Sequence, residues 1–83
     1  MIESQQQLHE NFRVKAAAFL TAPSLVAGID FDDAAVTLKR YVLSELRDQE
    51  LASILARFPK LIRQLDVGTL SDLVTEVEAK LGD

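Results

Sequence analysis

The chain has 83 residues and a formal net charge of −4, and 48% of its residues are hydrophobic and 27% charged. This length and balance are typical of a single globular domain, residues 1–83, and exclude a disordered chain. Because there is no cysteine and only one histidine, disulfides, cysteine catalysis and a structural zinc site are excluded, and the acidic charge disfavours nucleic acid as a partner.

Residues 3–20 have the pattern of a first helix. Four apolar side chains recur at helical spacing and form one stripe, namely Leu8, Phe12, Ala16 and Phe19. Pro23 follows and ends the helix, because the residue before a proline avoids helical backbone angles. The next residues, 21–31, are predicted to form a loop. Its apolar side chains are expected to tuck under the bundle: Leu25, Val26, Ile29 and Phe31.

A second helix is predicted over residues 33–47, with Asp32 as its N-cap. Its buried stripe consists of Ala35, Leu38, Val42 and Leu46. Leu51 lies five residues beyond Leu46, which interrupts the helical rhythm and favours a break near Arg47–Asp48. Whether residues 33–58 form one bent helix or two stays open at this point. The segment after the break has its own apolar residues, Leu51, Ile54, Leu55 and Phe58.

Two further helices are predicted toward the end of the chain. Pro59 suits the first turn of a short helix over residues 59–66, which Gly68 ends. Thr69 then caps a last helix over residues 70–81. Its apolar stripe is Leu70, Leu73, Val74, Val77 and Leu81. Since no segment alternates with a period of two, we expect an all-α fold, a small bundle of four to five helices. Its core is expected to contain Phe12, Phe19, Phe58, Leu73 and Val77.

No group of residues in the sequence has the spacing of a catalytic or metal-binding site. Asp30, Asp32 and Asp33 lack the further ligands of a calcium loop, since Ala34 and Tyr41 stand where an oxygen ligand and a glutamate are needed. We therefore predict a protein that is not an enzyme and binds no metal. No apolar run approaches the roughly 18 residues of a membrane span, and the polar start is unlike a signal peptide. We expect no membrane partner and a cytoplasmic location.

The stretch RYVLSELRDQEL, residues 40–51, resembles the attachment motif of acyl and peptidyl carrier proteins. Leu46, Glu50, Leu51 and Leu55 reproduce that family's spacing, and the size, the acidity, the long apolar loop over residues 21–31 and the last helix of the chain also match. In this family a serine at a helix N-terminus carries a phosphopantetheine arm, because free N–H groups and the helix dipole favour a phosphate there. When this stretch is aligned with the family's motif, Ser44 stands at the position of the family's aspartate, and Glu45 stands at the position of the family's serine.

The resemblance implies an acyl-carrier-like fold in which Ser44 holds a 4′-phosphopantetheine arm and a thioester intermediate for partner synthases. Glu45, Asp48 and Glu50 are the predicted contact for a protein partner with a basic surface. The alternative is a helical interaction module without a prosthetic group, such as a degenerate carrier, a docking domain or a phage or immunity-type inhibitor. Three basic residues recur at helical spacing and form either a solvated face or a second binding stripe: Arg57, Lys60 and Arg63.

Overall fold

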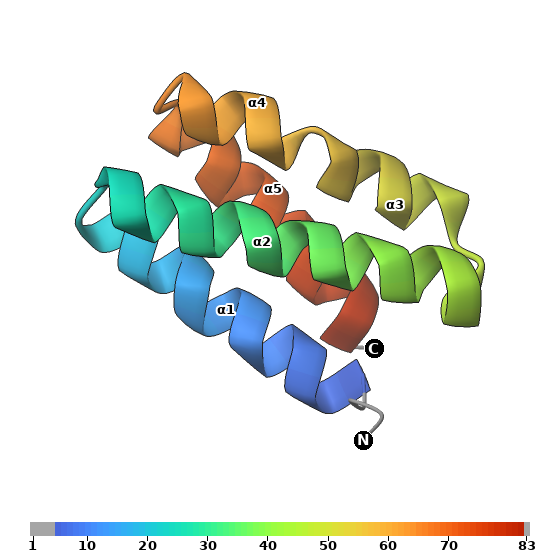
Figure 1. The fold of residues 1–83 in the computed structure, drawn as a ribbon. Coiled ribbons are helices and arrows are strands. Elements are labelled where there is room, and N and C mark those ends of the chain that lie inside the picture. Colours follow the sequence, from blue (N-terminus) through green and yellow to red (C-terminus); the bar gives the residue numbers. More distant parts are fainter. Residues whose placement is uncertain (1–4, 83) are drawn as a thin grey trace.

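The computed structural model describes residues 5–82, and every regular element in this range is helical. In chain order the elements are α1 (Gln5–Thr21), α2 (Leu25–Tyr41), the π-helical turn η1 (Val42–Leu46), α3 (Gln49–Ala56), α4 (Phe58–Arg63) and α5 (Val67–Gly82). Figure 1 shows α1 beside α2, with α3 and α4 running back along the other side of α2 and α5 crossing behind. The predicted all-α bundle is therefore confirmed.

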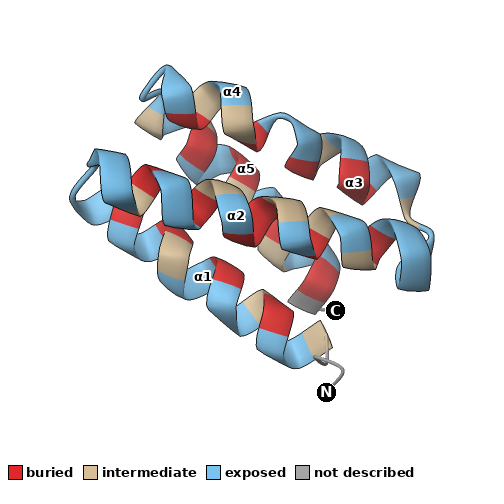
Figure 2. Ribbon diagram, viewed as in Figure 1, coloured by how far each residue is buried: buried red, intermediate tan, exposed pale blue. Residues whose placement is uncertain are grey.

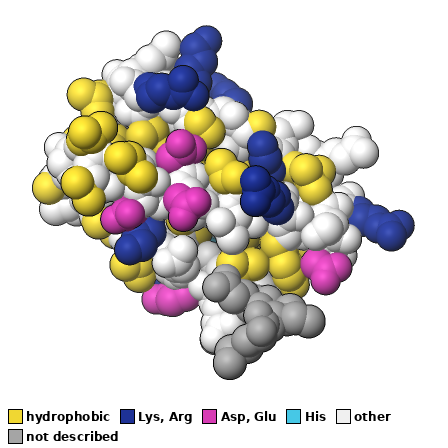
Figure 3. Space-filling view, in the orientation of Figure 1, with side chains coloured by type: hydrophobic (Ala, Val, Ile, Leu, Met, Phe, Trp, Pro, Cys, Tyr) yellow, Lys and Arg dark blue, Asp and Glu magenta, His cyan; other side chains and the backbone are white. Residues whose placement is uncertain are grey.

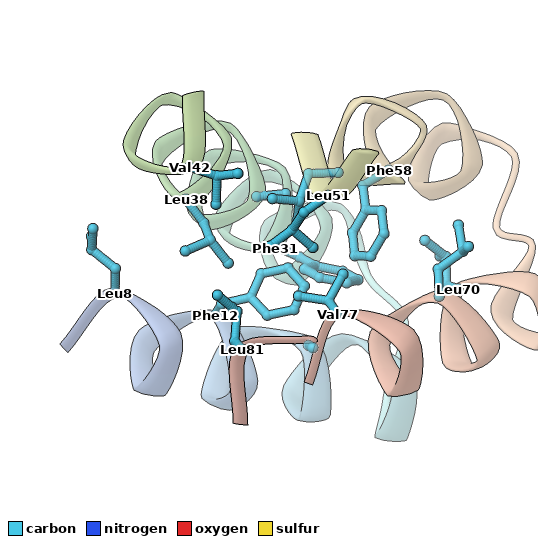
Figure 4. Packing of buried hydrophobic residues seen from close by; sticks show 14 of the residues in the cluster. Leu8, Phe12, Phe31, Leu38, Val42, Leu51, Phe58, Leu70, Val77 and Leu81 are labelled. Carbon is cyan, nitrogen blue, oxygen red and sulfur yellow. The ribbon is translucent and has the colours of Figure 1, made fainter. Parts of the chain in front are cut away.

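The core is formed by the inward faces of the helices, which carry the buried residues in Figure 2. Four phenylalanines lie at its centre, and Phe31 contacts the other three. Its ring centroid lies 5.7 Å from that of Phe12, 5.6 Å from that of Phe19 and 5.5 Å from that of Phe58. Buried aliphatic side chains surround these rings (Figure 4), including Leu8, Leu38, Leu51, Leu70 and Val77. The expected burial of Phe12, Phe19, Phe58, Leu73 and Val77 is confirmed.

Helix α2 begins within residues 21–31, so the predicted loop is wrong. Ser24 caps the helix, because its hydroxyl oxygen accepts a hydrogen bond of 3.1 Å from the backbone N–H of Ala27. Asp32, the predicted cap, lies well inside the helix. Phe31 is buried as expected. The other apolar residues of this segment are exposed instead of tucked under the bundle: Leu25, Val26 and Ile29.

The break between α2 and α3 lies where the interrupted leucine spacing predicts it. The backbone N–H groups of Arg47 and Asp48 both donate to the carbonyl of Val42, which closes the wide turn η1. Arg47 has a φ of 52°, a left-handed conformation typical of a helix end. Asp48 then caps α3, since its carboxylate accepts a hydrogen bond of 3.0 Å from the backbone N–H of Leu51. Residues 33–58 thus belong to separate helices, and Leu46, predicted to be buried, is exposed.

The last helix begins earlier than predicted, because Asp66 rather than Thr69 is its cap. The Asp66 carboxylate accepts hydrogen bonds from the Thr69 backbone N–H at 3.3 Å and from the Thr69 hydroxyl at 2.9 Å. Gly68 lies in the first turn of α5 and does not end the preceding helix. The turn after α4 is made instead by Leu65, whose φ of 55° is left-handed. Pro59 lies in the first turn of α4, as predicted.

Candidate interaction surfaces

Ser44 is exposed on η1, at the C-terminal end of the continuous helical segment formed by α2 and η1. Its hydroxyl donates a hydrogen bond to the backbone carbonyl oxygen of Tyr41, 3.5 Å away. The free groups at a helix C-terminus are carbonyl oxygens, and the helix dipole is negative there. The backbone around Ser44 therefore opposes a phosphate, whereas the serine of the carrier motif lies at a helix N-terminus.

Two of the three predicted partner-binding acids have partners within the chain. Asp48 caps α3 with its carboxylate. The carboxylate of Glu50 accepts a hydrogen bond of 2.9 Å from the ammonium group of Lys80 in α5. This hydrogen bond and the negative charge of Glu50 raise the pKa of Lys80, so the lysine stays charged and balances the glutamate. Glu45 is exposed on η1. Within the acidic cluster, Asp48 thus serves as a helix cap and Glu50 forms an ion pair.

Four large apolar side chains lie exposed in or next to the groove between the start of α2 and the end of α4. Their exposed fractions are 81% for Leu25, 70% for Val26, 60% for Ile29 and 59% for Leu65. We call these four residues the apolar strip. The groove has a volume of about 490 Å³, and three of the four strip residues line it. Single exposed apolar residues are ordinary, but a group of them on one face usually marks an interaction site.

Gly28 forms the floor of this groove, where α2 passes close to α1 and α4. A Cβ atom at this position would lie 3.3 Å from Cγ2 of Ile62 and 3.3 Å from Cε1 of Phe19, closer than side chains normally pack. Asp32 lines the same groove. One of its carboxylate oxygens is shielded from solvent and has no hydrogen-bond partner within residues 5–82. The groove is therefore lined mainly by apolar side chains, together with Ser24, Asp32 and Arg63.

Charged residues of opposite sign flank the apolar strip. Lys60 and Arg63 are exposed on α4, and Asp30 and Asp33 are exposed on α2. Each of these aspartates follows a strip residue by four positions, so it lies next to that residue on the helix surface. Figure 3 shows Lys and Arg gathered over α4, hydrophobic side chains beside them, and Asp and Glu over α2. The charged residues next to the strip are thus Lys60 and Arg63 on one side and Asp30 and Asp33 on the other, and further Lys or Arg side chains lie beside the acids in the same view.

The strip was not predicted from the sequence, because three of its residues belong to the segment expected to be a loop tucked under the bundle. One signal was available, since Ser24 directly after Pro23 is a good N-cap. A helix that starts there places Gly28, Phe31 and Ala35 on one face, and these residues are buried. The same helix turns Leu25, Val26 and Ile29 outward.

Neither a metal site nor a membrane span is found in the described part of the chain. No group of three or more His, Asp or Glu side chains within residues 5–82 is placed to hold a metal ion. None of the helices described combines the length and the apolar character that crossing a membrane requires. Comparisons with protein-family models, curated proteins and solved structures found no match for this chain, so none of them supports the resemblance to carrier proteins.

Proposed function

We propose that this chain is a protein interaction module without a prosthetic group, and that it binds another polypeptide through the apolar strip and the groove between α2 and α4. The observation that carries the proposal is the exposure of four large apolar side chains in or next to one groove. Covering apolar surface is favourable by roughly 25 cal/mol per Å². The strip is therefore a surface whose burial stabilises a complex.

The carrier interpretation would instead require Ser44 to accept 4′-phosphopantetheine. Ser44 lies at the C-terminal end of a helical segment, and Glu45 occupies the position of the family's serine. Both observations favour the interaction module over the carrier. The module needs no cofactor and no catalytic group of its own.

The acidic cluster of Glu45, Asp48 and Glu50 is the rival docking surface and would bind a partner with a basic surface. Using Asp48 or Glu50 in this way would compete with the cap of α3 and with the ion pair to Lys80. Docking on the strip has no such competition, because it removes apolar side chains from water. The strip is for this reason the surface that we propose.

Site-specific photo-crosslinking in the native host tests the proposal. A photoreactive amino acid replaces Ile29 in the strip, Glu45 in the acidic cluster or Val14 on α1. Val14 is the matched control, because it is another exposed β-branched residue in the middle of a helix. We expect a discrete protein adduct from position 29 and none from position 14. An adduct from position 45 alone would favour the acidic cluster, and an absence of discrete adducts from both 29 and 45 would contradict an interaction module.

A further inference from the structure

We infer that the polypeptide bound on the apolar strip is a second copy of this chain, related to the first by a two-fold axis that runs along the strip. This inference rests on the proposed function and identifies its partner. It comes from the opposite charges on the two sides of the strip, with Lys60 and Arg63 on α4 and Asp30 and Asp33 on α2. Self-association is favourable where a surface complements itself.

The symmetry brings each charged flank opposite its complement. A two-fold axis that lies in the plane of an interface and runs along the strip exchanges the two sides of that strip. The strip of one copy then covers the strip of the other. The basic flank on α4 of each copy faces the acidic flank on α2 of the other copy, so the same attraction occurs twice. Charge complementarity of this kind fixes the orientation of two surfaces and speeds their association.

A partner whose surface is only basic or only acidic fits this face less well. A basic partner would meet Lys60 and Arg63, and an acidic partner would meet Asp30 and Asp33. Stable interfaces bury roughly 800 Å² on each partner, which requires the flanks as well as the four strip residues. A second copy supplies an apolar strip and both signs of charge.

The first experiment measures the oligomeric state of the purified chain by sedimentation equilibrium over a concentration series. We expect a reversible monomer–dimer equilibrium for the wild type. Ile29→Glu should raise the dissociation constant at least about tenfold, because a charge in the centre of an interface is left without a partner. Val14→Glu, the same kind of substitution at an exposed position outside the strip, should leave the dissociation constant unchanged.

The second experiment exchanges the charges. One variant carries Lys60→Glu and Arg63→Glu, and the other carries Asp30→Lys and Asp33→Lys; all four positions are exposed. Each variant alone should dimerise more weakly than the wild type, because like charges then face each other. An equimolar mixture should form a heterodimer, because every acidic flank of one variant meets a basic flank of the other. Circular dichroism confirms that each variant keeps its helical fold.

Three results would overturn the inference. The wild type could stay monomeric at all concentrations, Val14→Glu could dissociate the dimer as strongly as Ile29→Glu, or the mixed charge variants could fail to associate. The crosslinking at position 29 separates these failures from a failure of the proposed function. A monomeric chain that still forms a discrete adduct with a different protein contradicts the second copy and leaves the interaction module standing.

Discussion

At the scale of single residues, Phe31 has the largest expected effect on stability, because its ring contacts three other buried rings. We predict that Phe31→Ala lowers the free energy of unfolding by about 3–5 kcal/mol, a large share of the stability of a domain of this size. Thermal and urea denaturation measure the effect. Val14→Ala, at an exposed position, should change it by less than about 0.5 kcal/mol. Equal effects of the two substitutions would contradict the described core.

Asp48 caps α3, and we predict that this cap contributes more to stability than the negative charge does. Removing the cap with Asp48→Ala should cost about 1 kcal/mol of unfolding free energy, whereas Asp48→Asn should stay close to the wild type because asparagine caps equally well. Urea denaturation of the two variants distinguishes the roles. If asparagine destabilises as much as alanine, the negative charge is the important property. For binding studies of the acidic cluster, Asp48→Asn is therefore the substitution that removes charge without removing the cap.

Ser44 should not accept a phosphopantetheine arm, because it lies at the C-terminal end of a helical segment, where backbone carbonyl oxygens and the negative end of the helix dipole repel a phosphate. The test is incubation with coenzyme A and a promiscuous phosphopantetheinyl transferase, followed by intact mass spectrometry, with an ordinary carrier protein as positive control. We expect the mass of this chain to stay unchanged. The gain of one arm, abolished by Ser44→Ala, would establish the carrier interpretation instead.

At the scale of the helices, two glycines with different surroundings should respond differently to substitution by alanine. Gly68 lies in the first turn of α5, and a Cβ atom there would have no neighbour within 4 Å. Gly68→Ala should stabilise the chain by about 0.4–1 kcal/mol, because alanine restricts the unfolded chain more than glycine does. Gly28→Ala should gain less or lose stability, since its Cβ would press on Ile62 and Phe19 where α1, α2 and α4 meet.

The comparison of their melting temperatures separates backbone entropy from helix packing. An equal gain for both variants would show that α2 moves away from its neighbours without loss. A loss for Gly68→Ala would contradict the open surroundings of the first turn of α5.

At the scale of the whole molecule, the helices should unfold together, because one cluster of buried residues draws on α1, α2, α3, α4 and α5. The chain contains one tyrosine and no tryptophan, so Tyr41 reports on a single place near the end of α2. Its side chain packs against the core. We predict that tyrosine fluorescence and far-ultraviolet circular dichroism give the same urea midpoint, as two-state unfolding requires. Separate midpoints would show that part of the bundle opens on its own.

Local sequence signals determined much of the helical fold. The stripe Leu8–Phe12–Ala16–Phe19 is predicted and buried, because a period of 3.6 residues places such side chains on one face. The predicted stripe of the last helix is buried as well, except for Val74, which is half-buried. The break near Arg47–Asp48 was predictable for the same reason, since a step of five residues leaves that face. The start of α2 could also be predicted, since Ser24 is a good N-cap. The apolar residues at positions 25–31 gave a stronger signal, however, and that signal indicated burial.

Only the tertiary structure decided which apolar and charged residues remain available for binding. Burial depends on the faces that neighbouring helices cover, and α1 and α4 meet α2 at Gly28, which leaves Ile29 outside. The pairing of Glu50 with Lys80 joins residues 30 positions apart, so no local pattern predicts it. The sequence by itself determined the helices and their inward faces, whereas their packing against one another determined the surface.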